Sequence, residues 1–386
     1  MEKVRHALCI LALSMASTPG FSEQKTTTTD ATTKTTMRSL YVAISELLPL
    51  SLNGKEFSSE KNRQRILRDL EQLSKSSNFL VDHFRATGRS SYNYLASSLR
   101  RDSFEAYRLY QSYQYNDARF TLHHITENCV SCHTKLENSS TNFNIPAFFA
   151  KINESGLDSL EVAHYYVMAR KFDKALDVYE RELTNGDTNY MPPRIFADYS
   201  KIVLRVNQNP LRAKKTLEKI LPSIQIQSQK DLTATWLTSL DNVIAKKMLD
   251  RSDLKTAKEL MTLAQNSQQY PADPRGLMYF VCASSILNKY VADDKHSPEE
   301  LSEAYYLLGK SEYFISDSFW VSEMDYFLES AIRLAPQTAS AVRAYNMLEQ
   351  QYIIGYSGSS GVHLPADIVE LLQELRQLIE KSGKKT

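Results

Sequence analysis

Apolar side chains recur three or four positions apart over long stretches of this chain, and that spacing constrains the fold more than any other feature. The first stretch contains Met37, Leu40, Ile44 and Leu47, which a helix would place on one face. Only 11 Gly and 12 Pro interrupt the 386 residues, so few positions favour tight hairpins. We therefore predict an all-α protein.

Residues 37–142 contain four helical patterns of this kind, joined by short connections. The first ends at Gly54, the second ends at Gly88, and the fourth begins near Asp117. Short connections make neighbouring helices antiparallel, and four such helices pack most simply as an up-down bundle. We predict an N-terminal four-helix bundle over this range.

Two segments precede the predicted bundle. Residues 1–22 resemble a secretory signal peptide, because the basic residues Lys3 and Arg5 are followed by an apolar run of about ten residues. A bilayer-spanning helix needs about 20 apolar residues, and no later stretch has that length, so we expect no transmembrane segment in the mature chain. Residues 23–36 are rich in Thr and nearly devoid of apolar side chains, so we predict a flexible leader there.

Residues 143–386 have a different pattern, in which small and bulky side chains follow the spacing of a helical repeat. Ala163 and Ala175 lie twelve positions apart, with Tyr166 and Phe172 at bulky positions between them. This spacing resembles the tetratricopeptide repeat, a helix pair that stacks on its neighbours.

Looser matches to the same repeat support this assignment. They lie at residues 245–261 and 308–336, and a final amphipathic helix follows Pro365. Stacks of such pairs form grooves that hold a peptide or a partner's helix. We predict that residues 143–386 form an α-solenoid of tetratricopeptide-like helix pairs that docks a protein.

The motif Cys129-Val130-Ser131-Cys132-His133 carries the most specific chemistry of the chain. Covalent attachment of haem needs two thiols on one side of the chain and an imidazole that can reach the iron. On a helix, Cys129, Cys132 and His133 project from one face. We predict one haem c, attached through thioethers to both cysteines. Because c-type haem is attached outside the bacterial cytoplasm, the motif and the signal peptide together predict a bacterial periplasmic protein.

Other uses of these residues agree less well with the sequence around them. A thioredoxin-like pair would follow a strand, whereas residues 120–127 have a helical pattern. A zinc site would need further ligands, and Cys282 lies far along the chain in an apolar context. A disulfide between Cys129 and Cys132 would be strained within a helix. We expect Cys282 to be a buried small apolar residue.

A haem motif on the last helix of a four-helix bundle resembles the cytochrome c-prime group and its low-spin relatives, over about residues 37–136. The resemblance implies that His133 is the proximal iron ligand and that a residue of the first helix closes the opposite face. That residue is apolar in the five-coordinate members and methionine in the six-coordinate ones. Met37 is therefore the candidate distal ligand, and packing in the core is the alternative.

Three other histidines are candidates for the surroundings of the haem. His123 and His124 precede the motif on the same predicted helix. A helix that supplies the proximal imidazole cannot easily reach the other haem face, so we expect these two at the surface or near the propionates. His83 could approach the haem edge, although a single imidazole near a helix end is usually structural.

Charge and motifs narrow the function further. With 46 basic and 45 acidic residues, the chain gives no electrostatic reason to expect a nucleic-acid partner. It contains no Gly-rich phosphate loop and no common hydrolase motif, so we expect no enzyme. We expect a monohaem c-type cytochrome that exchanges electrons with a redox protein docked on the repeats. The alternatives are haem-based binding or sensing of a diatomic gas, and a protein-assembly scaffold with a structural haem.

Overall fold

The computed structural model describes residues 23–86, 90–134, 159–185, 193–270, 273–293, 295–315 and 323–383. Nearly all of the secondary structure within these ranges is helical, which confirms the predicted all-α class. None of the helices in them combines the length and the apolar character that a membrane span requires. The predicted signal peptide at 1–22 and the predicted domain boundary near residue 142 lie outside the described residues.

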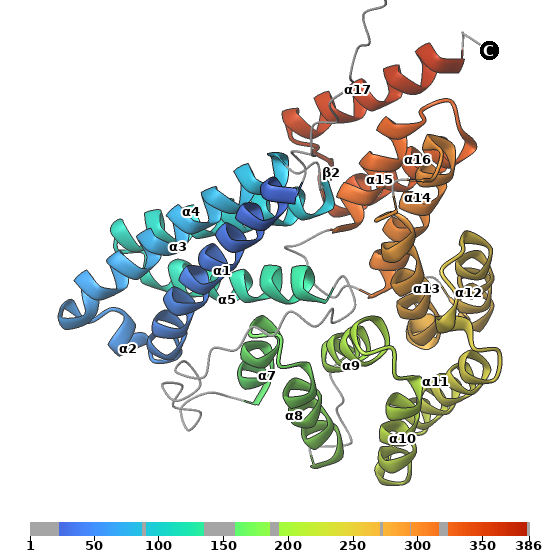
Figure 1. Ribbon diagram of the computed structural model, residues 1–386, viewed down its shortest axis with the longest axis horizontal. Helices are drawn as coiled ribbons and strands as arrows, with labels where there is room; N and C mark the ends of the chain where they lie inside the picture. The colour runs from blue at the N-terminus through green and yellow to red at the C-terminus, as the bar shows by residue number, and fades with distance from the viewer. Residues whose placement is uncertain are drawn as a thin grey trace, which may run out of the picture.

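The N-terminal part contains four long helices and one short one. They are α1 (Glu23–Leu52), α2 (Gly54–Phe57), α3 (Glu60–Ala86), α4 (Ser90–Gln111) and α5 (Tyr115–His133). In chain order, α1 lies against α3, α3 against α4, and α4 against α5 (Figure 1). The break after α1 falls where the sequence predicts it, because the Asn53 side chain caps α2 and accepts a hydrogen bond from the Lys55 N–H.

Residues 23–36, for which the sequence predicts a flexible leader, are instead the first turns of α1. Thr33 ties this part of the helix to α3, since its hydroxyl lies 2.9 Å from Nε2 of His83. A Thr-rich segment forms a helix poorly by itself, but extending an existing helix costs much less free energy than starting one. The packed half of α1 supplies that start, with Ile44 and Leu47 almost fully buried.

The C-terminal part is a succession of shorter helices in which chain neighbours pack on each other. The α-helices are α7 (Ser159–Met168), α8 (Phe172–Asn185), α9 (Pro193–Ser200), α10 (Pro210–Ile220), α11 (Gln227–Ala245), α12 (Leu254–Ser267), α13 (Leu277–Tyr290), α14 (Pro298–Ile315), α15 (Glu323–Leu334), α16 (Ala339–Gly355) and α17 (Ala366–Gly383). Between them lie the π-helix η2 (Lys201–Val206), the 3-10 helices η3 (Leu221–Ser223), η4 (Met248–Asp250) and η5 (Pro274–Gly276), and the strands β1 (Ser357–Gly358) and β2 (Gly361–Val362). α7 packs on α8, α10 on α11, and α14 on α15.

Small residues allow two of these helix pairs to approach closely. Ala163 of α7 and Ala175 of α8, the small positions of the sequence pattern, are completely buried. Gly309 of α14 lies against α15, where an added Cβ would be 2.7 Å from Cδ2 of Leu328. Real side chains do not tolerate that distance, so this helix pair depends on glycine.

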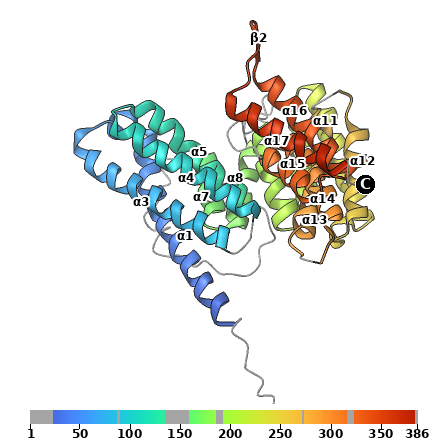
Figure 2. The ribbon, with the colours of Figure 1, turned by 90° about the horizontal axis from the view of Figure 1, so that it is seen from above.

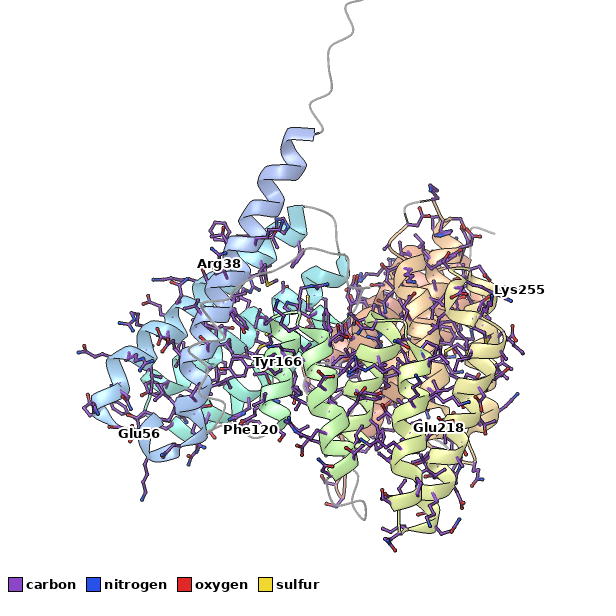
Figure 3. All side chains as sticks on the ribbon, turned by 60° about the horizontal axis from the view of Figure 1, so that its bottom comes forward. Arg38, Glu56, Phe120, Tyr166, Glu218 and Lys255 are labelled. Atoms are coloured by element: carbon purple, nitrogen blue, oxygen red, sulfur yellow. The ribbon has the colours of Figure 1, made fainter. Side chains whose placement is uncertain are left out.

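One apolar core lies among the N-terminal helices and a second runs through the helices from α7 onward, and the two interlock where α5 meets α7. Val130 of α5 belongs to the C-terminal core, whereas Tyr165 and Met168 of α7 belong to the N-terminal core. The Tyr165 hydroxyl donates to the carbonyl oxygen of Ile44 on α1, at 3.3 Å. Tyr166 of the same helix lies at this junction (Figure 3). The end of α5 therefore contacts both parts of the molecule.

A second contact joins the two parts through α4 and α15. The rings of Tyr94 on α4 and Tyr326 on α15 stack with their centroids 5.1 Å apart and their planes 28° apart. The two parts lie side by side in both overall views (Figures 1 and 2). The N-terminal helices thus contact the C-terminal part both at its first helix, α7, and near its end, at α15.

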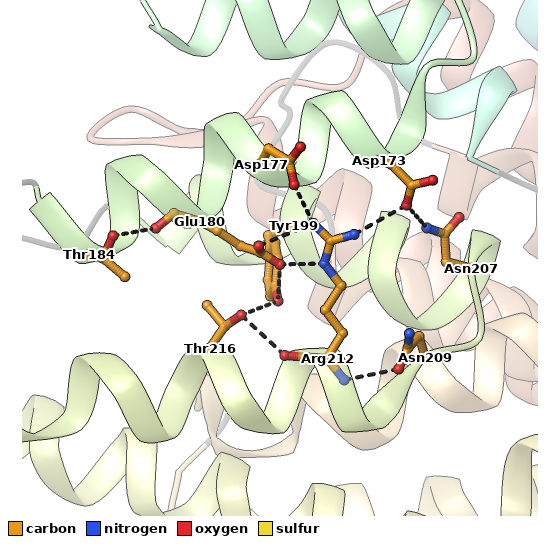
Figure 4. A network of polar contacts seen from close by, with 9 residues as sticks. All are labelled: Asp173, Asp177, Glu180, Thr184, Tyr199, Asn207, Asn209, Arg212 and Thr216. Carbon is orange, nitrogen blue, oxygen red and sulfur yellow. Dashed lines mark hydrogen bonds and ion pairs between the residues drawn. The ribbon is translucent and has the colours of Figure 1, made fainter.

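Arg212 of α10 joins its helix to α8 through three carboxylates (Figure 4). Its guanidinium donates to Asp177 and Glu180 at 2.7 Å and to Asp173 at 3.1 Å. The Tyr199 hydroxyl completes the network by donating to Glu180. A charged network with several partners holds geometry better than a single surface ion pair, so α8 and α10 are fixed relative to each other.

Candidate haem-attachment site

The Cys129–His133 motif lies at the C-terminal end of α5, where the buried stripe of that helix continues into it. Ala118, Leu122 and Ile125 of the stripe are completely buried in the N-terminal core. Cys129 is the next residue of the stripe, and it packs half-buried against the same core. The spacing that makes α5 amphipathic therefore also directs the first cysteine toward the other N-terminal helices.

α5 ends directly after the motif. Thr134 is its C-cap, and both the backbone N–H and the hydroxyl of Thr134 donate to the carbonyl oxygen of Val130, at 3.0 and 2.8 Å. His133 is therefore the last helical residue, with no further turn of α5 beyond it. An imidazole at a helix end is less crowded by its own helix than one in the middle.

Cys129 and Cys132 are both partly exposed. Burial, and then the neighbouring Cys132, raise the pKa of Cys129 to about 12. A redox-active cysteine pair depends on a thiolate with a lowered pKa. The surroundings of Cys129 therefore do not favour the thioredoxin-like use of this pair.

His133 contacts the backbone of α7. Its Nδ1 lies 3.2 Å from the carbonyl oxygen of Val167. A carbonyl oxygen can only accept, so Nδ1 carries the proton and donates it, and Nε2 keeps its lone pair. Burial, and then the positive charge of Arg170, lower the pKa of His133 to about 4, so the imidazole is neutral at pH 7. A neutral imidazole with one nitrogen held by a carbonyl is the usual state of a metal-binding histidine.

Met37 lies on α1 and is half-buried. It packs against the N-terminal core, as Cys129 does from α5. The structure thus brings the candidate distal methionine and the first motif cysteine to one apolar core from two different helices. Packing in that core is what the alternative interpretation of Met37 predicts as well, so its role as a ligand stays a prediction.

The other histidines contact groups of their own. Nδ1 of His124 lies 3.7 Å from Oε1 of Glu127 on the same helix, and the His83 ring contacts Thr33 on α1.

Cys282 is buried in the C-terminal core, as the sequence predicts for a small apolar residue. Burial raises the pKa of its thiol to about 12.

His123 lines a cavity of about 200 Å³ between the two parts of the molecule. Its Nδ1 lies 3.6 Å from Glu161 of α7, and in the same cavity His164 lies 3.3 Å from Asp198 of α9. The sequence analysis did not anticipate this cavity, because its walls come from α1, α5, α7 and α9. Within the described residues, no group of three or more His, Cys, Asp or Glu side chains is arranged to hold a metal ion.

The donor set at the end of α5 fits a covalently attached haem. Two thiols are available for thioether bonds, and an imidazole offers Nε2, while haem iron takes only its axial ligands from protein. The sequence analysis missed Val167 and Arg170, which complete the surroundings of His133. No protein family, curated protein or solved structure matches this chain.

Proposed function

We propose that this protein is a periplasmic monohaem c-type cytochrome of a bacterium, and that it exchanges electrons with a redox protein docked on its C-terminal part. The observation that carries the proposal is the contact between His133 and Val167. The carbonyl oxygen lies 3.2 Å from Nδ1, and a neutral ring that carries its proton on Nδ1 would bind iron through Nε2. The adjoining pair of cysteines, at the spacing of a haem-attachment motif, supports the same proposal.

Each motif residue has a distinct role in this proposal. Cys129 and Cys132 anchor the haem through thioethers, and His133 binds the iron from the proximal side. The haem supplies a one-electron couple of ferric and ferrous iron. The chain keeps the imidazole of His133 neutral by burying it and holds its ring in one orientation through the α7 carbonyl. Because the protein holds this ligand in the same geometry in both iron states, electron transfer requires less rearrangement around the iron.

The helix arrangement supports a specific fold for each part. The sequential packing of α1, α3, α4 and α5, with the motif on the last, is what a cytochrome c-prime-like bundle requires. In that group, Met37 would close the distal face. The buried small residues Ala163, Ala175 and Gly309 between packed helices support a tetratricopeptide-like solenoid from α7 onward.

Maturation of the full chain tests the proposal. We expect that the chain, exported in a bacterium that expresses the c-type maturation machinery, carries one haem that survives denaturation, detected as added mass and by in-gel haem staining. Cys129→Ala and Cys132→Ala should each reduce covalent haem strongly. Cys282→Ala is the matched control, because it removes a thiol outside the motif and should leave haem content unchanged. Wild-type protein without covalent haem would overturn the proposal.

A further inference from the structure

Charged side chains from α12, α14 and α16 meet on one surface of the C-terminal part, where α14 contacts both of the other helices. Glu303 of α14 is at the centre. Nζ of Lys258 on α12 lies 3.2 Å from one oxygen of its carboxylate, and the guanidinium of Arg343 on α16 donates to the other at 2.5 Å. The Ser340 hydroxyl donates to that second oxygen as well. One carboxylate thus joins α14 to the helices on either side of it.

A third cation, Lys310, lies on the same face of α14. Glu303, Tyr306 and Lys310 follow one another at intervals of three and four residues, which a helix places in one row. Arg343 reaches this row, because its guanidinium carbon lies 4.8 Å from the centroid of the Tyr306 ring, one turn before Lys310. Lys258, Lys310 and Arg343 together form what we call the three-cation surface.

The three-cation surface has more positive charge than its own carboxylate balances. Within the described residues, Lys310 forms no ion pair. Glu299, one turn before Glu303, instead accepts a hydrogen bond from Gln337 at 3.1 Å. Burial, and then the charge of Arg343, lower the pKa of Lys310, as expected of a half-buried ammonium beside another cation. Three cations therefore share one carboxylate.

Two of the cations are accessible from solvent. The side chains of Lys258 and Arg343 keep 50% and 48% of their surface exposed, whereas that of Glu303 keeps only 17%. An ammonium has three hydrogen-bond donors and a guanidinium has five, so the contacts to Glu303 leave other donors of both groups for a further anion. An incoming anion can therefore bind this surface without displacing Glu303.

We propose that the three-cation surface docks an acidic segment of a partner protein, whose carboxylates bind Lys258, Lys310 and Arg343. The inference rests on the proposed function only for the redox nature of that partner. The cations come from three helices, so they fit a ligand with several carboxylates along its length better than a single small anion. Arginine binds a carboxylate through two parallel hydrogen bonds, and lysine binds one as a point charge. Complementary charge chiefly accelerates association and selects the partner.

Two substitutions change the charge of the surface in opposite directions. Lys310→Gln removes the cation that forms no ion pair within the described residues, so no such pair is lost. Glu303→Gln removes the carboxylate that competes for Lys258 and Arg343, and it keeps the shape of the side chain. Lys219→Gln is the matched control for Lys310→Gln, because it changes the net charge equally at an exposed position of α10.

The experiment is a calorimetric titration of the full chain with a hexaglutamate peptide at fixed ionic strength. We expect Lys310→Gln to weaken binding about tenfold, which is the loss of one hydrogen-bonded charge contact. Glu303→Gln should bind the peptide more tightly than the wild type, and Lys219→Gln should stay near the wild-type affinity. A hexalysine peptide should not bind, and higher salt should weaken the binding of hexaglutamate.

Several outcomes would overturn the inference. Equal affinities of Lys310→Gln and Lys219→Gln would show that net charge alone attracts the peptide. Binding of the wild type to phosphatidylglycerol vesicles but not to hexaglutamate would assign the surface to a membrane. Binding of inorganic phosphate as tightly as the peptide would assign it to small anions. A chain without covalent haem would overturn the proposed function instead, because the peptide titration does not depend on haem.

Discussion

The guanidinium of Arg205 donates to the carboxylate of Glu312 at 2.7 Å, and the two side chains keep only 1% and 3% of their surface exposed. Arg205 also donates to the Ser284 hydroxyl at 3.1 Å. The pair joins η2 to α14 across the C-terminal core. A buried ion pair adds little stability compared with apolar residues, but the loss of one partner leaves the other charge buried and uncompensated.

Glu312→Ala should therefore destabilise the protein strongly. We expect the free energy of unfolding, measured with urea, to fall by about 3–5 kcal/mol. Asp241→Ala is the matched control, because Asp241 pairs with Lys214 at the surface, and its loss should cost less than about 1 kcal/mol. Replacing both Arg205 and Glu312 by apolar residues should recover most of the loss. A small effect of Glu312→Ala alone would contradict the uncompensated-charge argument.

Gly309 tests the close approach of α14 and α15. In Gly309→Ala, the new Cβ would lie 2.7 Å from Cδ2 of Leu328 and 3.3 Å from the Met324 oxygen, so the buried Leu328 side chain or the helices themselves must shift. We expect a loss of about 1–3 kcal/mol in the free energy of unfolding. Gly355→Ala should be neutral or slightly stabilising, because nothing lies within 4 Å of its added Cβ. Equal changes in the free energy of unfolding for the two variants would show that helix propensity, and not packing against α15, sets the effect of Gly309→Ala.

Asp273 should make the free energy of unfolding depend on pH under acidic conditions. Burial raises the pKa of this carboxylate, but hydrogen bonds from the backbone of Gln269 and Arg275 and the charge of Arg275 lower it below its ordinary 3.8. A lowered pKa stabilises the fold above the unfolded-state value, and the contribution is lost as pH falls through the folded-state value. We expect stability to fall below about pH 4 and that fall to be smaller in Asp273→Asn.

The control for Asp273 is Asp250→Asn, at an exposed position. It should leave the acid dependence of the unfolding midpoint unchanged. At neutral pH, Asp273→Asn should cost about 1–3 kcal/mol, because the charged acceptor of several hydrogen bonds is lost. If Asp273→Asn kept the full acid dependence, other carboxylates would be responsible for it.

Met37→Leu distinguishes a distal ligand from a core residue. The two side chains have similar volumes, so the free energy of unfolding should change by less than about 1.5 kcal/mol. In the oxidised haem protein, we expect the methionine–iron absorption band to disappear and carbon monoxide binding to the reduced form to increase. Met248→Leu, a substitution in the C-terminal core, should change neither. A high-spin wild-type protein that binds carbon monoxide readily would favour the gas-binding alternative.

Two of the boundaries among the N-terminal helices were predictable because they depend on local signals. α1 ends at Leu52, beside the predicted break at Gly54, and α5 begins within two residues of the predicted Asp117. The helical start at residues 23–36 was not predictable from composition, because the packed remainder of α1 stabilises it.

The sequence motif predicted only some of the residues that make up the candidate haem-attachment site. Spacing alone places Cys129, Cys132 and His133 on one helix face. The acceptor for His133 is Val167, 34 positions later, and the charge beside it is that of Arg170. Which residues meet the end of α5 depends on how α7 crosses it, and no periodicity within either helix contains that information.

The stacked rings of Tyr94 and Tyr326 have a consequence for the order of folding. Chains are synthesised from the N-terminus, and early domains fold first. α4 is complete long before α15 exists, so the Tyr94 face must remain exposed while most of the chain is still being made. Contacts between such distant segments form late. We expect this junction to be the last part of the molecule to close during folding, and a nascent chain that lacks α15 to be the form most exposed to chaperones and proteases.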